Sequence, residues 1–122
     1  MPGKEHDLQI DYIEFPATDI EATKKFYQQV FGWKFQDYGP DYTSFLDGRL
    51  AGGFNKGAQP TTQSEGQTSG PLIVIYAESL EEIYGEVKTA GGKIVKEIFG
   101  FPGGRRFHFT DPNGNELAVW SE

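Results

Sequence analysis

The sequence contains no cysteine and a single methionine among its 122 residues. Disulfides, thiolate zinc sites and cysteine nucleophiles are therefore excluded, and a transition-metal site would need His, Asp or Glu ligands. No apolar stretch approaches the roughly 20 residues of a membrane-spanning helix. The first seven residues also lack the apolar run of a secretory signal. We therefore expect a cytoplasmic protein with no membrane association.

Basic residues are scarce as well, because 11 Lys and Arg face 18 Asp and Glu, which gives a formal net charge of −7. This charge would repel duplex nucleic acid rather than attract it, so we expect no nucleic-acid partner. Aromatic residues, in contrast, make up 15% of the chain and could fill a core or line a pocket. The length suits one domain spanning residues 1–122.

Hydrophobic periodicity predicts the same order of elements twice. A strand, a helix capped by Asp19 and ended by Gly32, and three short strands occupy about residues 8–55. A polar, Gly-rich stretch at about 55–70 is interpreted as a linker. A strand, a helix with a Ser79/Glu82 capping box, and three more strands occupy about 71–121. The predicted strands lie at 8–15, 33–35, 42–46, 50–54, 72–76, 93–95, 105–110 and 116–120. The residues at the starts of the two predicted helices match at an offset of 60 residues. From periodicity alone, duplication and two ordinary capped helices explain this match equally well.

Several short segments, taken in order, favour duplication. Together they resemble the vicinal oxygen chelate superfamily, which includes glyoxalases, bleomycin-resistance proteins and dioxygenases. The segments are 13–19 (IEFPATD), 26–27 (FY), 31–33 (FGW), 90–95 (AGGKIV) and 109–117 (FTDPNGNEL). The resemblance implies an α+β fold in which two βαβββ modules curl a mixed sheet around a cavity. It also implies a small-molecule ligand and, commonly, a homodimer.

The last of these segments can be interpreted physically. Pro112 and Gly114 suit a tight turn, and Asp111 can accept hydrogen bonds from the turn backbone. A three-residue loop of this kind pairs His108 with Ala118. Alternation then directs one set of side chains to the helix-covered core, namely Phe107, Phe109, Leu117 and Val119. The other set faces the family's cavity, namely Arg106, His108, Thr110, Glu116, Ala118 and Trp120.

The family's metal ligands, in contrast, are missing. The resemblance places the ligand positions of the three assignable strands on Tyr12, Leu72 and Ala118, and the strand at 50–54 offers no His or carboxylate. Leu and Ala cannot bind a metal, and a single phenol would not hold one. We therefore expect neither the family's metal nor any other cofactor.

The candidate ligand-binding residues are polar or aromatic side chains on the predicted cavity face, namely Tyr12, Glu14, Arg106, His108, Glu116 and Trp120. Each has a plainer interpretation: Tyr12 as core packing, Glu14 as a solvated carboxylate, one of Arg105 and Arg106 as surface charge, and His108 as a hydrogen-bonded structural group. His108 is the one candidate for general acid–base catalysis. Residues 99–104 are interpreted as a flexible Gly-rich rim that covers a pocket.

Four functions remain open at this point. The first is a metal-free protein that binds a small organic molecule in an aromatic cavity. The second is a lyase or dioxygenase that uses acid–base chemistry or an atypical metal site. The third is a drug-sequestering resistance protein. The fourth is a scaffold or partner-binding domain without a small-molecule ligand. The ligand itself does not follow from a fold that hosts many reactions.

Overall fold

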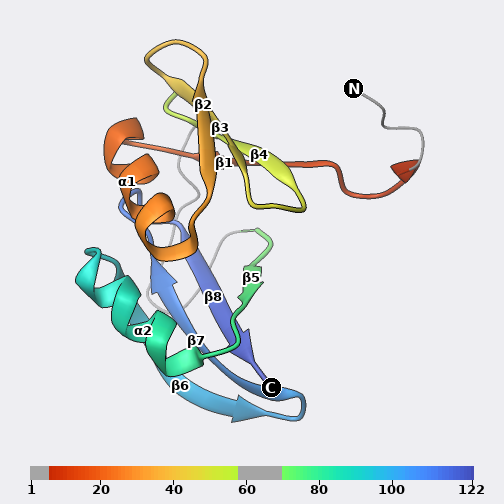
Figure 1. The fold of residues 1–122 in the computed structure, drawn as a ribbon, viewed down its shortest axis with the longest axis vertical. Coiled ribbons are helices and arrows are strands. Elements are labelled where there is room, and N and C mark those ends of the chain that lie inside the picture. The colour runs from red at the N-terminus through yellow and green to blue at the C-terminus, as the bar shows by residue number, and fades with distance from the viewer. Residues whose placement is uncertain (1–5, 58–69) are drawn as a thin grey trace.

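The computed structural model describes residues 6–57 and 70–122 (Figure 1). In the first half, strand β1 (Tyr12–Pro16) leads into helix α1 (Ile20–Phe31), and strands β2 (Lys34–Asp37), β3 (Tyr42–Leu46) and β4 (Ala51–Asn55) follow. In the second half, β5 (Ile73–Tyr76) leads into α2 (Leu80–Thr89), and β6 (Lys93–Phe101), β7 (Gly104–Thr110) and β8 (Glu116–Ser121) follow. Each half is therefore a βαβββ unit, as the repeat predicted.

Sheet topology is the same in both halves. The first sheet has the order β1-β4-β3-β2 and the second has the order β5-β8-β7-β6. The first two strands of each order, β1 with β4 and β5 with β8, are parallel. Both helices lie along one side of the molecule and contact each other (Figure 1). Among residues 6–57 and 70–122, neither helix has the length and apolar character that crossing a membrane demands.

A single aromatic core joins the two halves through α1. Tyr27 lies 5.1 Å from Phe54 of the first sheet, while Phe26 lies 5.9 Å from Phe109 of the second, measured between ring centroids. Phe26, Tyr27, Phe54 and Phe109 are all buried. Such packing of large aromatic rings dominates the energetics of a core, so α1 is the central element of this fold.

The turn between β7 and β8 contains a buried carboxylate. Asp111 is 5% exposed, and its Oδ1 accepts the backbone N–H groups of Asn113 and Asn115 at 2.9 Å each. Its Oδ2 accepts the hydroxyl of Tyr27 from α1 at 2.9 Å. Burial raises the pKa of the Asp111 carboxyl, although the hydrogen bonds from Tyr27 and Asn115 oppose that shift. The predicted self-bonding turn is therefore confirmed, and it also binds α1.

The same turn reaches the start of α1. Asn113 Oδ1 accepts the backbone N–H of Thr18 at 2.8 Å and the hydroxyl of Thr23 at 3.1 Å. Asn115 Nδ2 donates to the carbonyl of Pro16 at 2.9 Å. Since Asp19 caps the helix itself by accepting the Ala22 N–H, the first turn of α1 is held from both sides.

Three local predictions require correction. Strand β1 begins at Tyr12 rather than at residue 8, and Asn55, predicted to begin the linker, belongs to β4. Ser79 precedes α2 but makes no side-chain capping bond, so the predicted capping box does not form. Residues 58–69 of the predicted linker lie outside the described residues.

Candidate functional site

The candidate site lies on the face of the second sheet that points away from α2. The register pairs His108 with Ala118 and Arg106 with Trp120, as the turn predicted. On the opposite side of the same strands, Phe107, Phe109, Leu117 and Val119 are completely buried in the core. The predicted division of β7 and β8 into a core face and a second face is therefore confirmed. We call the second surface the β7 face and define it by Lys96, Phe99, Phe101, Arg106, His108 and Trp120.

His108 and Glu116 form a buried pair at one end of the β7 face. The Nδ1 atom of His108 lies 2.9 Å from Oε2 of Glu116, and the two side chains are only 6% and 8% exposed. Glu116 stands opposite Thr110 in the register, so its side chain reaches diagonally across the ladder to His108. His108 Nε2 is also buried and has no hydrogen-bond partner among the described residues. The carboxylate thus orients the imidazole and leaves its other nitrogen available.

Arg106 occupies the middle of the β7 face. Its guanidinium lies 5.4 Å from the ring centre of Phe99 and 5.6 Å from that of Phe101. Its Nε is buried and, within the part of the chain that the structure describes, forms no hydrogen bond. Arg105 points the other way and forms an exposed ion pair with Glu81 of α2, at 2.6 Å. The structure thereby separates the two arginines: Arg105 is a surface charge, and Arg106 lies on the β7 face.

Aromatic rings continue the β7 face toward the parallel edge of the sheet. The Phe101 ring lies 6.2 Å from Trp120, and Trp120 lies 5.1 Å from Tyr76 in an edge-to-face arrangement. Tyr76 is 48% exposed, and its hydroxyl donates to Glu122 at 3.0 Å. Rings held in a row at such spacings offer a surface against which a planar ligand can stack.

Sequence reasoning missed Lys96, and it placed Phe99 in a loop rather than in a strand, because β6 is irregular. The register shifts between Ile94 and Lys96, and again between Lys96 and Phe99, so strict alternation fails. These bulges place Lys96 opposite His108 and Phe99 opposite Arg106, while Ile94 packs on the core. The predicted flexible rim at 99–104 is also wrong, since Phe99, Gly100 and Phe101 end β6 and Gly104 begins β7. The aromatic side chains of Phe99 and Phe101 in this segment were the sequence signal for an aromatic surface here.

Tyr12 and Glu14 lie on β1, in the other sheet. The hydroxyls of Tyr12 and Tyr42 are 2.6 Å apart, and burial, more than the Tyr12 hydroxyl, raises the pKa of Tyr42. The pair lies over Gly53, where an added Cβ would collide with the Tyr42 hydroxyl. Glu14 is exposed and accepts a hydrogen bond from Asn55 at 3.1 Å. Among the described residues, no hydrogen bond, ion pair or ring contact joins Tyr12 or Glu14 to the β7 face.

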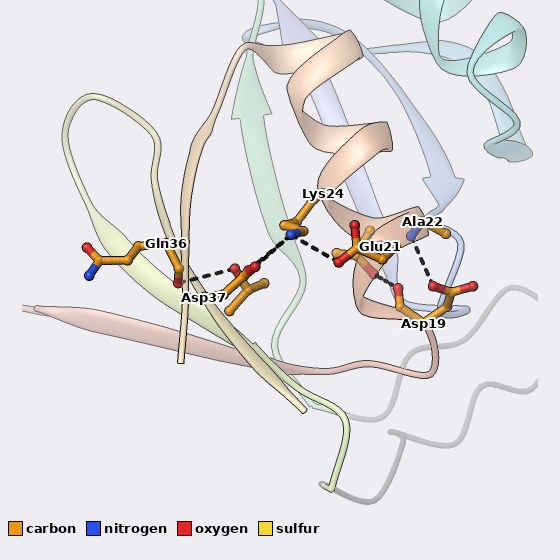
Figure 2. A network of polar contacts seen from close by, with 8 residues as sticks. Asp19, Glu21, Ala22, Lys24, Gln36 and Asp37 are labelled. Atoms are coloured by element: carbon orange, nitrogen blue, oxygen red, sulfur yellow. Dashed lines mark hydrogen bonds and ion pairs between the residues drawn. The ribbon is translucent and has the colours of Figure 1, made fainter. Parts of the chain in front are cut away.

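Two hollows in the described surface are lined by none of the six residues that define the β7 face, and the smaller one is lined partly by Tyr76. The larger, of about 590 Å³, lies between α1 and β2 and is lined partly by Lys24, Phe35 and Asp37. Lys24 bridges Glu21 and Asp37 there (Figure 2), and the two ion pairs measure 3.1 and 2.9 Å. These bonds, first of all the one from Asp37, raise the pKa of Lys24. The Lys24 ammonium is already paired with two carboxylates, so we interpret these ion pairs as a structural link between α1 and β2 rather than as part of a binding site.

The residues present do not suit the metal that the fold family implies. No group of three His, Asp or Glu side chains within residues 6–57 and 70–122 is arranged to hold an ion. Ala118 is completely buried opposite His108, so the last strand offers a methyl group at the expected ligand position. The buried His108–Glu116 pair supplies two donor groups, fewer than the three protein ligands of a typical catalytic zinc site. We therefore assign no chemical step to a metal.

Sequence comparison agrees with the fold. The profile of the Glyoxalase/Bleomycin resistance protein/Dioxygenase superfamily matches residues 9–119, and the chain belongs to this superfamily. A glyoxylase-like domain-containing protein from Didymella fabae is 33% identical over 119 residues, which cover 91% of this chain and 93% of that protein. The putative glyoxylase CFP32 of Mycobacterium bovis is 26% identical over 117 residues, and this chain spans only 44% of its length.

Solved structures share the fold at lower identity. The fosfomycin resistance protein FosX from Mesorhizobium loti gives a TM-score of 0.75 at 15% identity, with 94% of this chain and 92% of that chain covered. FosX from Listeria monocytogenes, in a variant complexed with Mn(II) and 1S,2S-dihydroxypropylphosphonic acid, gives 0.77 at 18% identity, with 93% and 90% covered. At these identities the likeness establishes the architecture only.

Proposed function

We propose that this protein binds a small organic molecule on the β7 face without the family's metal. The observation that carries the proposal is the pair of buried, unsatisfied nitrogens, Arg106 Nε and His108 Nε2, beside a row of aromatic rings. A buried polar atom without a partner costs about 1–3 kcal/mol, which a bound ligand would recover. Tyr12 and Glu14, which lie on the other sheet, are left out of this site.

Thermal unfolding tests the proposal. An aromatic ligand that binds the folded state raises the melting temperature by mass action, and we expect such a shift from members of a panel of neutral and charged aromatic compounds. Trp120→Ala should abolish the shift, because this ring forms the stacking surface. Tyr38→Ala, which removes a ring that is 60% exposed elsewhere, should retain it. The shift should also persist in a chelator. A panel without any hit, or equal loss in both variants, would contradict the proposal.

A second candidate function is acid–base catalysis of the lyase type. The specific observation that favours it is the His108–Glu116 pair, in which a carboxylate 2.9 Å from Nδ1 fixes the imidazole orientation. A neutral His108 held in this way presents Nε2 as a proton acceptor. Chemical conversion of a compound that is lost in His108→Gln even when that compound saturates the variant would distinguish this function from binding alone.

We also propose that the protein is a homodimer with two-fold symmetry. Both sheets end in edge strands, and apolar side chains near or on them are exposed, among them Tyr12 (45%), Val74 (41%) and Tyr76 (48%). Such surfaces favour association with another copy, and two-fold dimers are the commonest soluble assembly. Light scattering should give twice the chain mass of 13.6 kDa. A mass of one chain at all concentrations would refute this proposal.

A further inference from the structure

The charge on the β7 face is opposite to that of the protein as a whole. Although the net charge is −7, Lys96 Nζ and the Arg106 guanidinium each lie 5.4 Å from the centre of the Phe99 ring. The His108 ring is 5.9 Å from the same centre. Within the described chain, Lys96 and Arg106 form no ion pair with a carboxylate, and Glu116 is engaged by His108. This cluster of unneutralised cations favours an anionic ligand.

The two unsatisfied nitrogens restrict the ligand further. Arg106 and His108 are two positions apart on β7, so both side chains project from the same side of the strand. They lie about 7 Å apart along it. Arg106 Nε can only donate a hydrogen bond. With Nδ1 committed to Glu116, His108 Nε2 accepts when the imidazole is neutral and donates when it is protonated. An oxyacid satisfies both states, since its acid form donates and its anion accepts.

The rings indicate the rest of the ligand. Phe99, Phe101 and Trp120 surround Arg106, and each is partly exposed. We propose, on the basis of the function proposed above, that the β7 face binds an aromatic oxyacid, either an aryl carboxylate or a phenolate. Its ring stacks on the row of aromatic rings, and its oxyanion lies between Arg106 and His108. Because His108 Nε2 is shielded from solvent, the ring of Phe99, its aromatic neighbour, moves aside to admit the ligand.

Calorimetric titration with 2-naphthoate tests this inference, with its uncharged methyl ester as the matched probe. We expect 2-naphthoate to bind at least about tenfold more tightly than the ester, because charge-assisted hydrogen bonds to arginine are the stronger kind. Arg106→Gln should weaken naphthoate binding by about tenfold, and Lys96→Ala by about threefold, and neither should change the affinity for the ester by more than about twofold.

Two control variants remove the same kinds of cationic group at positions outside the β7 face. Arg105→Gln removes the neighbouring guanidinium, which pairs with Glu81, and Lys88→Ala removes an ammonium 5.6 Å from the Tyr84 ring. Both should bind naphthoate within about twofold of the parent protein. Equal affinity for naphthoate and ester would overturn the oxyacid inference but leave the proposed function intact. Binding of neither compound, with no hit in the thermal panel, would overturn both. An Arg105 variant as impaired as the Arg106 variant would also refute the site.

Discussion

Asp111→Ala is expected to lower the free energy of unfolding by about 3–5 kcal/mol, since it removes the acceptor from several buried donors at once. The hydroxyl of Tyr27, on a side chain with no exposed surface, would lose its partner at 2.9 Å. The backbone N–H groups of Asn113 and Asn115 would lose theirs as well. A loss of this size is a large fraction of the roughly 5–15 kcal/mol that holds a typical domain together.

Asp47 supplies a matched control for this prediction. It holds the turn between β3 and β4 by the same local chemistry, accepting the backbone N–H groups of Arg49 and Leu50 at 2.8 and 2.6 Å. That turn is exposed, so Asp47→Ala should cost only about 1 kcal/mol in urea unfolding. Equal losses for the two variants would mean that Asp111 acts only within its own turn, and that its bond to α1 contributes little.

His108→Ala is expected to destabilise the protein by about 2–4 kcal/mol, because it leaves the carboxylate of Glu116 buried without a partner. Alternation along β7 alone predicts a smaller effect than this, since it places His108 off the core. The structure changes that expectation because the two side chains are 6% and 8% exposed and 2.9 Å apart.

A double variant distinguishes two causes of this destabilisation, the unpaired carboxylate of Glu116 and the cavity left by the imidazole. His108→Ala combined with Glu116→Ala removes the stranded charge, and it should recover at least about 1 kcal/mol relative to His108→Ala alone. His6→Ala, which alters the other histidine of the chain at an exposed position, should leave the unfolding curve unchanged. A double variant less stable than His108→Ala would show that the cavity left behind, rather than the unpaired carboxylate, accounts for the loss.

Features with local causes could be predicted from the sequence. Helix α1 begins and ends where Asp19 and Gly32 predict, because a capping side chain and a positive φ of 72° act within one turn of the chain. The pairing of His108 with Ala118 follows from the turn chemistry at Pro112 and Gly114 in the same way.

Features with distant causes could not be predicted. The bulges that bring Lys96 and Phe99 onto the β7 face are shifts in the register of β6 against β7, and strict alternation along β6 does not predict them. The contact of Asn113 with Thr18 joins positions 95 residues apart, so no local pattern indicates it. The prediction at Ser79 was wrong for the opposite reason: the local capping signature is present, but the side-chain hydrogen bond does not form.

The docking of the β7–β8 turn onto α1 has a consequence for how the chain acquires its structure during synthesis. The polar groups around the first turn of α1 find partners on Asn113 and Asn115, which the ribosome adds about 90 residues later. Contacts of such long sequence separation form late, because the loop between them must be closed first. The nascent first module therefore emerges without these partners for the start of its helix, and they are supplied only when the last hairpin has been made.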